Sequence, residues 1–127
     1  MYLWGIDLFH AGFYWEAHEA WEAVWHACNR KGPLADLLKA LIKLAAAGVK
    51  ARENRPEGIR RHTRRAIELL KSVSSQLDAD TVFGLDLGRL ADESREIGEL
   101  ADSFAEKASS DLAGVTLPIR LISQRSG

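Results

Sequence analysis

Residues 13–25, with the sequence FYWEAHEAWEAVW, combine ionisable and aromatic side chains at the spacing of an α-helix. At about 100° per residue, His18 shares one helix face with several aromatic residues and with one carboxylate. The residues within about 60° of His18 on this face are Ala11, Tyr14, Trp15, Trp21, Glu22 and Trp25. Burying an imidazole or a carboxylate without a partner costs several kcal/mol. We therefore expect His18 and Glu22 to be satisfied by each other, by a facing helix or by a ligand.

The chain on either side of this segment predicts an all-α fold, a single-domain bundle of four helices over residues 1–127. The expected helices cover about residues 7–28, 33–52, 57–77 and 87–108. Asp7 and Asp86 are the expected caps of the first and fourth helices, and a polar linker at 78–85 precedes the fourth. The second helix contains the small residues 45–48, AAAG, so that the bulky aromatic side chains of the first helix can approach it closely.

The C-terminal residues 114–122, GVTLPIRLI, have the pattern of an extended segment. Apolar side chains alternate along it at Val115, Leu117, Ile119 and Leu121. Pro118 is incompatible with a helix interior because it lacks an N–H donor and clashes with the preceding turn. We therefore expect an extended strap that lies on the helical bundle.

Composition indicates a soluble cytoplasmic protein. The chain has 127 residues, of which 46% are hydrophobic and 28% charged, which suits one globular domain with a core of its own. A single cysteine, Cys28, excludes an internal disulfide framework. We expect neither a membrane span nor a signal peptide, because no apolar run is long enough for the first and the N-terminus lacks the pattern of the second. Four tryptophans and two tyrosines near one end could supply a homodimer surface.

The net charge of −1 conceals a strong segregation of charge along the chain. Residues 1–29 carry no Lys or Arg and four acids, residues 30–77 carry twelve bases and four acids, and residues 78–111 carry ten acids and three bases. Pairing between basic and acidic helices explains this segregation, and we favour it over a polyanion site. The alternative is a phosphate or nucleic-acid site on the row Arg60, Arg61, Arg64 and Arg65. The near-neutral net charge argues against nucleic acid.

Three hypotheses account for the ionisable residues of the first helix and a lysine that could face them. The candidate cluster is Tyr14, His18, Glu19, Glu22, Trp25 and Lys43. A metal site is disfavoured and no metal or cofactor is predicted, because His18 lacks the second histidine of a zinc-protease motif and no Glu-x-x-His pair recurs on another helix. Acid–base or anion chemistry would have His18 and Glu22 facing Lys43, Lys50 or the turn of Arg61, His62 and Arg65, beside aromatic side chains that could hold a planar ligand.

The third hypothesis is the favoured one. It makes His18 and Glu22 a hydrogen-bonded polar anchor that fixes how the first helix packs. Whether the protein is an enzyme, using His18 and Glu22 for acid–base or metal-assisted hydrolytic chemistry, stays open at this point. A structural anchor or a binding site for a small ligand or partner is the simpler interpretation.

The run IDLFHAGFYWEAHEAWEAVW at residues 6–25 resembles the signature of an uncharacterised family, domain of unknown function 309. Residues 40–47 and 54–58 resemble a second block of that family, so the likeness covers about residues 5–70. The chain has His10 where the family usually has Asn and Lys43 where it often has Gln. The resemblance implies an all-α bundle with the first helix central and no established activity, cofactor or substrate. The implied motif is Tyr14, Glu16, Ala17, His18, Glu19, Glu22 and Trp25.

Overall fold

The computed structural model describes residues 2–110 and 117–121. Within these residues the chain forms six helices and one two-stranded hairpin, which confirms the predicted all-α class. The helices are α1 (Tyr2–His10), α2 (Tyr14–Ala27), α3 (Pro33–Arg52), α4 (Pro56–Leu77), α5 (Leu87–Glu99) and α6 (Ala101–Ser110), and the strands are β1 (Thr81–Val82) and β2 (Leu85–Asp86). No helix among the described residues combines the length and the apolar composition that a membrane crossing requires.

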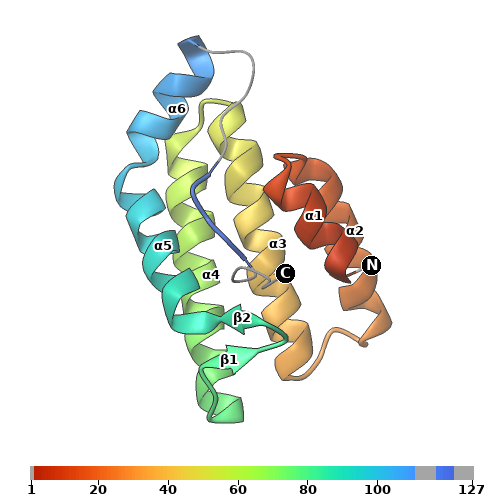
Figure 1. The fold of residues 1–127 in the computed structure, drawn as a ribbon. Helices are drawn as coiled ribbons and strands as arrows, with labels where there is room; N and C mark the ends of the chain where they lie inside the picture. The colour runs from red at the N-terminus through yellow and green to blue at the C-terminus, as the bar shows by residue number, and fades with distance from the viewer. Residues whose placement is uncertain (1, 111–116, 122–127) are drawn as a thin grey trace, which may run out of the picture.

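Helix α3 lies at the centre of the molecule (Figure 1). It packs against α2 on one side and α4 on the other, while α1 packs on α2 and α5 packs on α4. This central position explains why α3 buries eleven of its twenty residues. Its bounds, from Pro33 to Arg52, are those predicted from the sequence, because Pro33 suits the first turn of a helix.

The prediction of one long first helix is wrong. The chain turns at residues 11–13 and forms the antiparallel hairpin of α1 and α2, in which Asp7 lies within α1 and does not cap it. Gly12 has a φ of 87°, a left-handed conformation that glycine adopts without strain. The turn is closed by bonds from Gly12 N to Phe9 O, 3.0 Å, and from Phe13 N to Leu8 O, 2.8 Å.

The hairpin of α1 and α2 depends on close contacts between large and small residues. The Trp21 indole lies across Gly5 of α1, and the Tyr14 ring lies across Gly48 of α3. A Cβ atom added to Gly48 would come within 2.7 Å of three atoms of the Tyr14 ring. The predicted packing of aromatic residues of this segment on the small residues 45–48 is therefore confirmed at Gly48.

The fourth predicted helix is divided in two, and the predicted linker before it contains the hairpin of β1 and β2. In this hairpin Thr81 pairs with Asp86 and Val82 with Leu85. Asp86 also caps α5, as predicted, because its Oδ1 accepts a bond of 3.0 Å from Arg89 N. At Leu100 the chain leaves α5 and enters α6, which packs on α3 and α4.

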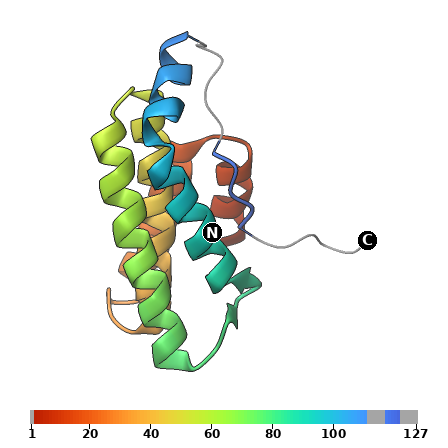
Figure 2. The ribbon, with the colours of Figure 1, turned by 90° about the vertical axis from the view of Figure 1, so that its left-hand side faces the viewer.

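The predicted strap is confirmed over Leu117–Leu121, while Val115 lies outside the described residues. It runs between α5 and α1 on the side of α3 that faces the viewer in Figure 1, and Figure 2 shows it from the side. Leu117, Ile119 and Leu121 are buried. Leu117 N donates to the Tyr14 hydroxyl at 2.7 Å, and Leu121 N donates to His10 Nε2 at 3.0 Å. The strap therefore ties the C-terminal part of the chain to the hairpin of α1 and α2.

Candidate functional site

The buried face of α2 is not the one centred on His18. The residues of α2 that are buried are Tyr14, Ala17, Ala20 and Trp21. Glu22 is exposed, as is Trp15 at 57%, and His18 is half-buried at the border of the face. The expectation that Glu22 shares the buried face is therefore wrong. The reason is geometric, because Trp21 occupies the centre of the packed face and the next residue on a helix points about 100° away.

The hydrogen bond expected between His18 and Glu22 is not formed in the described part of the chain. The Nδ1 atom of His18 is enclosed and has no hydrogen-bond partner among the described residues. The imidazole instead stacks on the Trp15 ring, with centroids 5.6 Å apart and planes 5° from parallel. Glu19 is exposed as well.

The other predicted residues of the cluster have separate surroundings. Tyr14 is buried, and its hydroxyl holds the strap at Leu117. Trp25 contacts the ring of His26 and the guanidinium of Arg30, which lies 5.6 Å from its centroid. Lys43 is half-buried on α3, on a line of half-buried residues three or four positions apart. This line comprises Asp36, Lys39, Lys43, Ala46 and Lys50.

His62 of α4 belongs to the same surroundings as Lys43, although the predicted cluster did not include it. The half-buried position of the imidazole is the main cause that lowers the pKa of His62 to about 4. The charges that lower this pKa further belong, in decreasing order, to Lys43, Arg61, Lys50 and His18. Three helices thus bring bases to one place. We call His18, Lys43, Lys50, Arg61 and His62 the basic cluster.

The pKa of Lys43 is shifted in the same direction as that of His62. Burial is the main cause that lowers the pKa of the Lys43 ammonium. The positive charges that lower this pKa further belong to Lys39, Arg65 and Arg61. The charged groups that lower the pKa of His62 and of Lys43 are all bases.

Two members of this region have a carboxylate partner at its edge. Lys50 Nζ lies 3.1 Å from Glu53 Oε1, and its aliphatic stem packs on Gly58 of α4. Arg65 lies 3.1 Å from Glu68. The described residues show no ion pair or hydrogen bond for the side chains of Lys43 and Arg61. These two cations are therefore available to a ligand.

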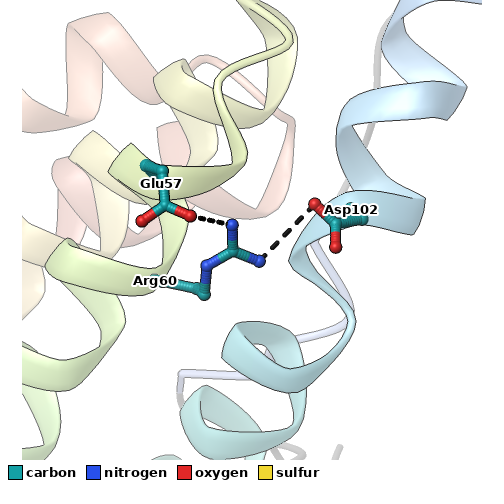
Figure 3. A network of polar contacts seen from close by, with 3 residues as sticks. All are labelled: Glu57, Arg60 and Asp102. Carbon is teal, nitrogen blue, oxygen red and sulfur yellow. Dashed lines mark hydrogen bonds and ion pairs between the residues drawn. The ribbon is translucent and has the colours of Figure 1, made fainter.

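The predicted row of four arginines is divided between two sides of α4. Arg60 binds Glu57 of its own helix and lies 3.5 Å from Asp102 of α6 (Figure 3). Arg60 and Arg64, with Arg95 of α5, line a hollow of about 430 Å³ between the two helices. Arg61 and Arg65 instead act on Lys43. The predicted pairing of basic and acidic helices is confirmed at Arg60, and the four arginines do not form one continuous surface.

Residues 2–62 match the family model described as domain of unknown function, DUF309. This part of the chain is similar to the DUF309 family. The match confirms the resemblance noted in the sequence, with bounds slightly different from the expected 5–70. No curated protein and no solved structure matches the chain. The DUF309 segment contains the whole basic cluster, and His62 is its last residue.

Proposed function

We propose that the basic cluster of the DUF309 segment binds a small oxyanion, the phosphate or carboxylate group of a ligand. The observation that carries the proposal is the set of five bases on three helices, in which the charged groups that lower the pKa of Lys43 and of His62 are all bases. Lys43 and Lys50 carry positive charge at half-buried positions, which is unfavourable, and a bound anion would offset that cost. The Nδ1 atom of His18 also supports the proposal, because it is enclosed and has no hydrogen-bond partner among the described residues.

Calorimetric titration with inorganic phosphate and with sulfate tests the proposal. We expect wild-type protein to bind both ions and Lys43→Gln to bind them at least roughly tenfold more weakly, because a hydrogen bond between charged groups contributes about 1.5–3 kcal/mol. Lys71→Gln is the matched control. It removes the same charge from an exposed position on α4 and should change affinity by less than about twofold.

Two results would overturn this proposal. One is a wild-type protein that binds neither ion at millimolar concentration. The other is an equal loss of affinity in the Lys43 and Lys71 variants, which would mean that the ions respond to the general charge of α4. Nuclear magnetic resonance of the histidine ring protons provides a local readout, since His18 and His62 should shift on binding whereas His26, which is bonded to Arg30, should not.

We infer further that the protein is cytoplasmic and forms a homodimer through the hairpin of α1 and α2. A cytoplasmic location is supported by the only cysteine, Cys28, which is free. Dimerisation is supported by four large apolar side chains that are more than half exposed, Leu3, Trp4, Phe13 and Trp15. Sedimentation velocity should show a dimer that Trp4→Ser weakens. A wild-type protein that stays monomeric at its highest soluble concentration would exclude it.

A further inference from the structure

Two hydrogen bonds attach the strap to the hairpin of α1 and α2, and their acceptors differ in chemistry. Leu117 N donates to the Tyr14 hydroxyl at 2.7 Å, and Leu121 N donates to His10 Nε2 at 3.0 Å. A tyrosine hydroxyl can accept throughout the range around neutral pH, because tyrosine ionises only near about pH 10. An imidazole nitrogen accepts only while it carries no proton. The attachment at Leu121 therefore depends on the charge state of His10.

The bond to Leu121 fixes which form of His10 the docked strap requires. The lone pair of Nε2 faces the backbone N–H of Leu121, so the imidazole is neutral and its proton is on Nδ1. A proton added to Nε2 would set one donor against another and leave the amide without this acceptor. The side chain of Leu121 is fully buried, which keeps the amide at this position. Because a donor without an acceptor is unfavourable away from water, the docked position of Leu121 is then less stable.

The charged groups that face His10 come from α1 and from the strap itself. Burial is the main cause that lowers the pKa of His10 below its ordinary value of 6.5. The positive charge of Arg120, on the strap, lowers this pKa further, whereas the carboxylate of Asp7, one turn earlier on α1, raises it. Arg89 of α5 holds the backbone next to Leu121, since its guanidinium donates to Arg120 O at 2.6 Å. Departure of this end of the strap would remove both Arg120 and part of the burial from His10.

We propose that His10 is an acid-sensitive latch, in which protonation of the imidazole releases the strap at Leu121 while the Tyr14 hydroxyl still holds it at Leu117. This inference concerns the strap and does not depend on the anion site. The docked state binds fewer protons than the released state, because the pKa of His10 is lower when the strap is docked. Docking is therefore fully favoured above about pH 6.5 and weakens by up to about tenfold per pH unit as the pH falls toward the pKa of the docked state.

Amide hydrogen exchange, followed by nuclear magnetic resonance on the full chain, measures the two attachments separately. The protection factors of the Leu117 and Leu121 amides are compared at about pH 7.5 and about pH 5, on either side of the ordinary histidine pKa. We expect protection of Leu121 to fall at least about threefold and that of Leu117 to change by less than about twofold. The ring protons of His10 report its charge state in the same samples.

Two substitutions test whether His10 is the group responsible. His10→Gln provides a side-chain carbonyl that can accept from Leu121 N and does not titrate, so protection of Leu121 should be equal at the two pH values. His26→Gln is the matched control, since His26 is exposed on α2 and should not affect the strap. This variant should retain the wild-type change at Leu121.

Several results would overturn the latch. One is a wild-type protein in which Leu121 is equally protected at both pH values, whether the ring of His10 becomes protonated or stays neutral at the lower one. Another is a loss of protection that persists in His10→Gln, because a different group would then control the strap. Equal losses at Leu117 and Leu121 would indicate general destabilisation by acid. If His10→Gln does not fold, the comparison of the two amides in wild-type protein, with the ring titration, still decides the question.

Discussion

Replacement of Trp21 by alanine is expected to lower the free energy of unfolding by about 3–5 kcal/mol. The indole is fully buried, its centroid lies 5.9 Å from that of Phe9, and it covers the Cα of Gly5. Its Nε1 donates a bond of 3.1 Å to Tyr2 O. The substitution therefore leaves a cavity at the contact of α1 and α2 and also removes the donor that satisfies a backbone carbonyl.

Trp15→Ala is the matched control, since the two tryptophans lie six residues apart on the same helix. Trp15 is 57% exposed, so we expect its loss to cost less than about 1 kcal/mol. Urea unfolding of both variants, followed by circular dichroism, gives the comparison directly. Equal losses would contradict the structure, because they would mean that α2 packs through the face centred on His18.

Gly48→Ala is expected to destabilise the protein by about 1–3 kcal/mol, even though alanine favours a helix interior by about 1 kcal/mol. The added methyl group would overlap the Tyr14 ring, which has little freedom to move. Phe9 packs against one side of this ring, with centroids 5.0 Å apart, and the Arg52 guanidinium lies 4.9 Å from the Tyr14 centroid. Relief of the overlap would require α2 and α3 to separate.

Gly88→Ala provides the control for Gly48→Ala. Gly88 also lies in a helix, α5, but the nearest atom to an added Cβ is Asp86 Oδ1 at 3.8 Å, which is an ordinary contact. We expect this variant to be as stable as wild type or to gain up to about 1 kcal/mol. In thermal and urea unfolding, Gly48→Ala should therefore be less stable than wild type, whereas Gly88→Ala should be as stable or more stable. A stabilised Gly48 variant would show that the ring of Tyr14 is not fixed against α3.

Local sequence patterns predicted the two helices that begin with proline. They did not predict the turns that depend on tertiary packing. Pro33 and Pro56 mark the starts of α3 and α4, and both helices have the expected extent. The sequence alone did not show whether Gly12 forms a turn or is a tolerated glycine within one long helix. The turn is favoured by the contact of Trp21 with Gly5 across the hairpin, which is a tertiary contact. Gly98 lies two residues before the change from α5 to α6 at Leu100, but a single glycine within a helical pattern does not by itself mark a helix end.

The candidate site was also predictable only in part, because local sequence patterns do not specify how the helices pack on one another. His18 and Lys43 were both in the predicted cluster, and the anion hypothesis had them facing each other across two helices. Glu22 was included because the helical wheel was centred on His18, and this choice assumes that Trp15 belongs to the core. Trp15 is exposed, so the buried face lies elsewhere on α2. His62 was named with Arg61 and Arg65 as one of the groups that His18 could face, but it was not included in the candidate cluster. Its relation to Lys43 and Lys50 depends on the register of α3 against α4, which no local pattern specifies.

The strap shows that the segment matched by the family model is shorter than the packed unit to which it belongs. The DUF309 match ends at residue 62, in the first third of α4, whereas α4 continues to Leu77. Tyr14, inside the match, has its hydroxyl bonded to the backbone of Leu117, more than a hundred residues away. An excised segment 2–62 would expose the buried face of α3 and leave Tyr14 without that bond. The part that is shared with the family contains the basic cluster, and the part that is not shared supplies the packing that holds it in place.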